Sequence, residues 1–201
     1  MKKHKFPLLV VLGICLILIS VSLLLFFQTC LHLGAQHSRR IILQMNEILP
    51  EKTQGVPGVY PSSAMPVLEI DGVDYVAIVE VPSFGITLPV ADQWDSDKLY
   101  RSPARFFGST YDSTLIIGGA DYPLQFGFCD EIEHGVVITI TDMTGAQFSY
   151  NVSRIDRAKH AETQWLQNEE YDLTLFCRNT YSMEYIALRC ISANNNRIKK
   201  Q

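Results

Sequence analysis

The stretch Tyr171-Asp-Leu-Thr-Leu-Phe-Cys-Arg-Asn179 decides the expected fold of this chain. It carries a short apolar run, Leu173–Phe176, between polar residues, which is typical of a buried strand. Cys177 and Arg178 follow this run, so they lie where a strand leaves its sheet. Strand ends on a rigid scaffold are a common place for functional side chains. A second apolar strand is expected shortly afterwards, over Tyr185–Cys190.

Short strands separated by turns fill most of the chain from Val67 onward. Asp71-Gly72 is a two-residue hairpin signal between two apolar segments, and Asp142–Gly145 separates two more. In the segment Ala146–Val152, apolar and polar side chains alternate, as in a strand with one buried face. Many short strands with few helices predict an all-β domain that closes into a barrel.

Residues 6–27 form an apolar run of 22 residues without a charge, behind a basic flank at residues 1–5. As a helix rising about 1.5 Å per residue, such a run crosses a bilayer core of about 30 Å. We expect a single membrane-spanning signal anchor in the cell membrane. Lysine clusters stay in the cytoplasm, so the C-terminal domain lies outside. A cleaved signal peptide is the alternative, but the run is long for that role and no Ala-x-Ala site follows.

Residues 28–66 are expected to form a stalk with an amphipathic helix that ends at Pro50. This helix either packs its apolar stripe on the domain or carries it toward the membrane. The stalk leaves residues 67–192 as the barrel domain and residues 193–201 as a polar tail. The apolar positions of the stripe are Ile41, Ile42, Met45, Ile48 and Leu49.

Charge and cysteine usage exclude several classes of function. The formal net charge is -4, and the first 30 residues hold lysines but no acid, so the remainder is more acidic still. An acidic outer domain argues against nucleic acid as a partner. The five cysteines form no C-x-x-C pair, and the acids are scattered over turns, so we expect no metal and no cofactor. The sequence leaves a disulfide between Cys129 and Cys190 open.

Three groups of short motifs occur in a fixed order between residues 67 and 190. They are Val73–Pro82 with Ile86–Val90, then Phe106–Ser109 with Ile116–Tyr122 and Phe126-Gly127, and last Asp172–Phe176 with Ile186–Cys190. Together with the N-terminal apolar run, this order resembles that of the sortases, in particular of class-B-like members. Sortases are membrane-anchored cysteine transpeptidases of Gram-positive cell surfaces.

The resemblance implies a mostly β fold with minor helices, namely an eight-stranded β-barrel preceded by one transmembrane helix and a short helical stalk. It also implies a groove that leads to a cysteine, a histidine and an arginine. In that family the cysteine attacks a backbone carbonyl of a sorting signal, and the acyl group then passes to an amine, often of peptidoglycan or a pilin. The histidine protonates the leaving amine, and the arginine stabilises the oxyanion.

Carried over position by position, the resemblance puts other residues at the catalytic positions. The family motif Thr-Leu-x-Thr-Cys aligns without a gap from Thr174 to Arg178, so Arg178 takes the nucleophile's position and Cys177 that of the second threonine. Ala120 takes the position of the histidine. A guanidinium keeps its proton and cannot attack a carbonyl, and alanine has no proton to give.

The third position is also substituted. The family arginine opens the last strand, where this chain has Tyr185, or Glu184 after a shift of one residue. Neither residue supplies a fixed cation. Substitution at all three catalytic positions predicts a pseudoenzyme that has the sortase fold but no transpeptidase activity.

Cys177 has two interpretations. A one-residue deletion before it places its thiol at the nucleophile's position, although a shift by one residue turns a strand side chain to the other face. The candidate bases are then His134 and His160, which no spacing ties to Cys177 and which we expect on the surface. Otherwise Cys177 is a small buried hydrophobic residue.

Arg178 is either a surface charge or a side chain that fills the former groove and pairs with Asp121. Tyr122 and Thr174 are the other expected groove residues. We therefore expect a membrane-anchored module that binds sorting-signal peptides, a pilin or an active sortase without cleaving them. The alternative is an active, divergent sortase that attaches proteins to the cell wall through Cys177.

Overall fold

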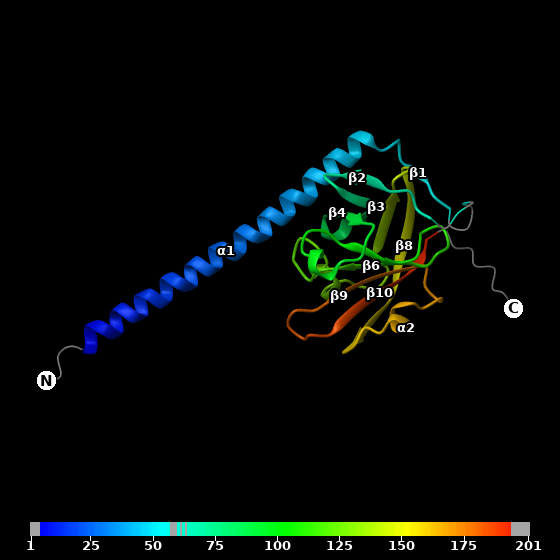
Figure 1. Cartoon of the computed structure of the whole chain (residues 1–201). Coiled ribbons are helices and arrows are strands. Elements are labelled where there is room, and N and C mark those ends of the chain that lie inside the picture. The colour runs from blue at the N-terminus through cyan, green and yellow to red at the C-terminus, as the bar shows by residue number, and fades with distance from the viewer. Residues whose placement is uncertain (1–4, 57–59, 61, 63, 194–201) are drawn as a thin grey trace. The chain divides into compact units, whose positions relative to one another are not determined.

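The computed structural model describes residues 5–56, 60, 62 and 64–193 (Figure 1). The basic flank apart from Lys5, residues 57–59, 61 and 63 of the expected stalk and nearly all of the polar tail lie outside the described residues. The chain divides into two units between Gln36 and His37. The first is helical and belongs to α1 (Lys5–Ile48).

The spanning helix expected over residues 6–27 is not found among the residues that the structure describes. No helix in that part of the chain is both long and apolar enough to cross a membrane.

The second unit begins with the last turns of α1, which pack on the outside of the domain. Ile41 and Met45 are fully buried there. Their partners are three side chains of the neighbouring strands: Ile70, Tyr75 and Ile78. The apolar stripe therefore packs on the domain, which was one of the two expected arrangements. The helix ends at Ile48, two residues before Pro50, because proline cannot continue the hydrogen-bond ladder.

The described part of the domain contains ten strands and four short helical segments. The strands are β1 (Thr53–Gln54), β2 (Leu68–Ile70), β3 (Val73–Val81), β4 (Ile86–Ala91), β5 (Ala104–Phe107), β6 (Leu115–Gly119), β7 (Val137–Asp142), β8 (Ala146–Ala158), β9 (Leu173–Arg178) and β10 (Tyr185–Ser192). The helical segments are η1 (Pro82–Phe84), η2 (Ser96–Lys98), η3 (Gly127–Asp130) and α2 (Thr163–Leu166).

Eight of the described strands close into a ring, in the order β3-β4-β5-β6-β9-β10-β8-β7, and β7 pairs again with β3 (Figure 1). The pairs β4–β5 and β6–β9 are parallel, and the other pairs of the ring are antiparallel. The short strands β1 and β2 extend the sheet beyond the ring at β8 and β3. The ring confirms the predicted eight-stranded barrel, whose closure leaves no free edge between neighbouring ring strands.

Asp142 fixes the hairpin between β7 and β8 that the sequence predicted. Its buried carboxylate accepts hydrogen bonds from the backbone N–H of Thr144, at 2.8 Å, and of Ala146, at 2.9 Å. It also accepts one from the Tyr111 hydroxyl at 2.6 Å. Burial and this hydrogen bond raise the pKa of Tyr111. The Tyr111 ring in turn stacks on Tyr60 at 3.9 Å, so one buried carboxylate holds a turn and two remote segments together.

Side chains of β9 alternate between the two faces of the barrel wall. Leu173, Leu175 and Cys177 belong to the central core. Phe176 belongs to a separate cluster on the outer face, and Arg178 is exposed. This alternation follows from the two-residue period of a strand, and it separates Cys177 from Arg178.

Candidate functional site

The three substituted positions predicted from the sequence meet at the ends of three adjacent strands. In the parallel pair β6–β9, Gly119 lies opposite Cys177, so Ala120 leaves β6 beside the position where Arg178 ends β9. In the antiparallel pair β9–β10, Arg178 lies opposite Tyr185. The closed register thus brings Ala120, Arg178 and Tyr185 together at one end of the barrel.

Arg178 is held in place by its own loop. Its Nε donates to the carbonyl of Met183 at 3.5 Å, and its guanidinium carbon lies 5.8 Å from the centre of the Tyr185 ring. Of the two arrangements expected for Arg178, the structure has the exposed side chain, and the pair with Asp121 is not formed. Asp121 instead accepts a hydrogen bond from the backbone N–H of Thr180 at 2.7 Å. The carboxylate takes this nearby donor because the two loops lie side by side.

Ala120 is built into the loop that follows β6. Its N–H donates to the side-chain oxygen of Gln125 at 2.5 Å, and its carbonyl accepts from the N–H groups of Tyr122 and Phe126. The carbonyl of Tyr122 in turn accepts from Gln125 and Gly127. The expected groove residue Tyr122 therefore shapes this turn through its backbone. The side chain at position 120 is a methyl group, which cannot transfer a proton.

Cys177 lies in the core and not at the surface. Only 2% of its surface is exposed, and its Sγ donates to the carbonyl of Phe126 at 3.7 Å. Cys129 lies beside it: burial raises the pKa of the Cys129 thiol, and a hydrogen bond with Cys177 raises it further. Cys129, Cys177 and Cys190 are all free and buried, so the disulfide that the sequence left open is not formed.

The two candidate bases lie on the surface, as the sequence predicted. His134 is exposed, and its Nδ1 lies 3.0 Å from the carbonyl of Ser153. His160 is exposed in the connection between β8 and α2. Within the described part of the chain, neither imidazole is hydrogen-bonded to Cys177.

Solved structures with the same arrangement of strands are sortases. Sortase C1 from Streptococcus agalactiae aligns with a TM-score of 0.54 and 20% identity, over 64% of this chain and 72% of that chain. Sortase C-3 from Streptococcus pneumoniae aligns with a TM-score of 0.54 and 14% identity, over 82% of this chain and 84% of that chain.

This chain has the sortase fold. A third similar structure is sortase C from Clostridium perfringens with the C-terminal cell wall sorting motif, at a TM-score of 0.50 and 19% identity, over 59% of this chain and 70% of that chain. No family model and no curated protein matches the sequence. The class-B-like resemblance stays a prediction.

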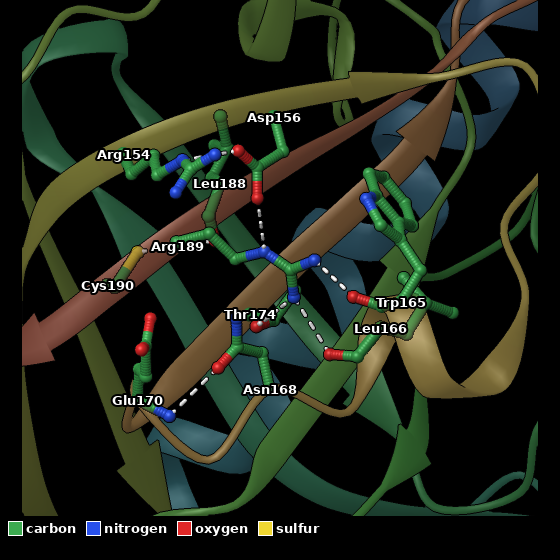
Figure 2. Close-up of polar contacts among 10 residues, drawn as sticks. All are labelled: Arg154, Asp156, Trp165, Leu166, Asn168, Glu170, Thr174, Leu188, Arg189 and Cys190. Carbon is green, nitrogen blue, oxygen red and sulfur yellow. Dashed lines mark hydrogen bonds and ion pairs between the residues drawn. The ribbon is translucent and has the colours of Figure 1, made fainter.

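Arg189 of β10, on the outer face of this sortase-fold barrel, is a residue of the site that was not predicted from the sequence (Figure 2). Its side chain is 1% exposed. Its Nε donates to Asp156 at 3.0 Å. Its Nη1 donates to the Leu166 carbonyl at 2.8 Å and to the Thr174 hydroxyl at 3.2 Å. Its Nη2 donates to the carbonyl of Trp165.

These contacts join β8, β9, β10 and α2 through one guanidinium. The guanidinium carbon also lies 5.0 Å from the ring centre of Trp165 and 6.0 Å from that of Tyr171. Thr174, an expected groove residue, is buried as a partner of Arg189 and is not available to a ligand. The signal in the sequence was an arginine inside the apolar run Tyr185–Cys190, where a buried charge needs several partners.

Aromatic side chains cover the outer face of β6 and β9 in this sortase fold. Trp94, from the β4–β5 connection, stacks on Phe176 at 5.5 Å and meets Phe106 edge-on at 5.1 Å. Glycine at position 118 lets the Trp94 ring approach β6 closely, because a Cβ there would lie 2.3 Å from that ring. Trp94 also lines two cavities of about 710 Å³ and 560 Å³. This aromatic face is the part of the site best suited to bind apolar groups.

Replacing Arg189 by methionine tests how much of this site depends on the buried guanidinium. The Trp165 carbonyl then loses its donor, while Asp156 keeps only Arg154 and the Leu166 carbonyl keeps only the N–H of Asn168. We expect the free energy of unfolding to fall by about 3 kcal/mol or more. Urea denaturation followed by circular dichroism measures the change. Arg157→Met is the matched control, since Arg157 forms a half-exposed pair with Asp130 and should change stability little. Equal losses in the two variants would contradict the central role of Arg189.

Proposed function

We propose that this chain is a membrane-anchored sortase-fold module that binds peptide segments of cell-surface proteins or pili without cleaving them. One observation carries the proposal: at the strand end where the resemblance places the nucleophile, the exposed side chain is Arg178, and the neighbouring Cys177 faces the core. A guanidinium stays protonated and is no nucleophile.

The surroundings of Cys177 support the loss of chemistry. A thiol must become a thiolate to attack a carbonyl, and a positioned base or cation normally assists it. The Cys177 thiol instead donates a hydrogen bond to the backbone carbonyl of Phe126 inside the core. Beside it lies the Cys129 thiol, whose pKa is raised by burial. The position of the family histidine holds Ala120, whose backbone is used by its own turn.

Peptide binding is the activity that this face retains. The Trp94 ring, 36% exposed, and the half-buried Phe106 ring cover the buried Phe176 ring on the outer face. Aromatic surfaces of this kind bury large apolar area at low entropic cost. One similar structure, the Clostridium perfringens sortase C, is in complex with a cell wall sorting motif, which supports a sorting-signal peptide as the bound segment. A pilin that carries a sorting signal would present such a segment, and an active sortase is a further candidate partner.

Membrane attachment is the second part of the proposal. The apolar run at residues 6–27 supports it, as does the exposure of the large apolar side chains described from Val10 to Phe26. Such a surface needs an apolar partner. The lysines of the basic flank favour a cytoplasmic N-terminus and a domain outside the cell.

An active, divergent sortase is the competing function, and a search for the acyl-enzyme separates the two. The protein is incubated with the sorting-motif peptide bound by Clostridium perfringens sortase C, and intact-mass spectrometry looks for a thioester. We expect none, because Cys177 is buried in the core. An adduct on Cys177 that disappears in Cys177→Ala would establish the enzyme and reject the pseudoenzyme.

The aromatic face is tested with Trp94→Ala. Removal of the indole takes away the largest ring of the face, so we expect affinity for the same peptide to fall about tenfold or more. Isothermal titration calorimetry measures the change. Tyr100→Ala is the control, because Tyr100 is an exposed aromatic residue of the same connection that lines neither cavity. If the control weakens binding as much as Trp94→Ala, the peptide does not bind on the aromatic face.

Membrane attachment is tested by fractionation of cells that express the full chain or a variant without residues 1–30. We expect the full chain in the membrane fraction after an alkaline wash, and the shortened chain in the soluble fraction, because the apolar run is then lost. A full chain that is released by the alkaline wash would contradict the anchor.

A further inference from the structure

The exposed guanidinium of Arg178 contacts two neighbouring residues. Its Nε donates to the Met183 carbonyl at 3.5 Å, and its guanidinium carbon lies 5.8 Å from the centre of the Tyr185 ring. No acidic side chain in the described part of the chain forms an ion pair with Arg178. A guanidinium that is oriented in advance loses less entropy when it binds a planar anion.

Asp121, the acid that was one of the expected partners of Arg178, makes a different contact. The Asp121 carboxylate is bound to the backbone N–H of Thr180, which holds the loop after β6 against the loop between β9 and β10. The protein as a whole is acidic, with a formal net charge of -4. An exposed, unpaired arginine at the centre of the candidate site therefore favours an anionic partner.

Exposed apolar side chains lie on the two loops next to the end of β9. Tyr181 is 95% exposed and Met183 is 52% exposed, both in the loop after β9. Leu124, on the neighbouring loop, is 50% exposed. Large apolar side chains grouped at a loop pair on an otherwise polar surface are typical of a binding site. This surface thus combines one cation, Arg178, with exposed apolar side chains on the neighbouring loops.

We propose that Arg178 binds the carboxylate of a docked peptide whose neighbouring side chains are apolar and pack on Leu124, Tyr181 and Met183. The inference rests on the proposed peptide-binding function and adds the chemical class that the site selects. A guanidinium binds a carboxylate by donating two parallel N–H···O hydrogen bonds to it. The site would then hold, without a covalent bond, a carboxylate where a catalytic sortase holds an acyl group.

Three matched libraries of random hexapeptides test this inference on the full chain in detergent. The first has free C-terminal carboxylates and no acidic residue, the second has amidated ends and no acidic residue, and the third has amidated ends and one internal glutamate. We expect the wild-type protein to enrich carboxylate-bearing peptides about tenfold over the amidated, acid-free ones. The first and third libraries distinguish a chain end from an acidic side chain.

Arg178→Gln is the diagnostic variant, because it keeps hydrogen-bonding capacity on an exposed side chain and removes the charge. We expect it to bind all three libraries equally. Arg157→Gln, on a half-exposed arginine of β8, should keep the preference of the wild type. A preference for carboxylates that survives in Arg178→Gln, or no preference in the wild type, overturns the inference but leaves peptide binding intact. If no library is enriched at all, the proposed peptide-binding function itself is wrong.

Discussion

The buried guanidinium of Arg189 is the interaction on which the candidate site depends. Removing such a charge from water costs several kcal/mol, and only a nearly complete set of partners offsets that cost. Asp156, Thr174 and the two carbonyls of α2 supply these partners (Figure 2). The rings of Trp165 and Tyr171 flank the charge. Because Arg189 lies on β10 and these partners belong to β8, β9 and the connection between β8 and β9, one side chain fixes the wall from which the site is built.

Strand register decides which side chains that wall presents. β9 lies between β6 and β10, and its pairing with both leaves no freedom to slide by one residue. A slip would exchange its inner and outer faces and bury Arg178 in the core. The same constraint that keeps Cys177 inside thus keeps a cation outside. The proposed loss of transpeptidase chemistry follows from two features. Side chains of β9 alternate between the inner and outer faces, and Ala120, Arg178 and Tyr185 take the positions of the family's catalytic residues.

The proposed peptide binding needs a surface and does not need a nucleophile. The aromatic rings around Trp94 and the exposed Arg178 offer apolar area and one charge, which are the ingredients of non-covalent recognition. Function is set by such sites and not by the barrel that carries them. The likeness to sortases therefore applies to the fold. The proposed peptide binding rests on the residues that this chain has at the site.

The sequence by itself determined the barrel, the packing stripe of α1 and the separation of Cys177 from Arg178, because strand alternation and helical periodicity are local patterns. Only the tertiary structure decided the partners of Arg189, the cover of Trp94 over Gly118 and the bond from Asp121 to Thr180. These contacts join residues that are distant in the chain. Local patterns give the face on which a side chain lies, but its partner depends on how the closed ring brings remote segments together.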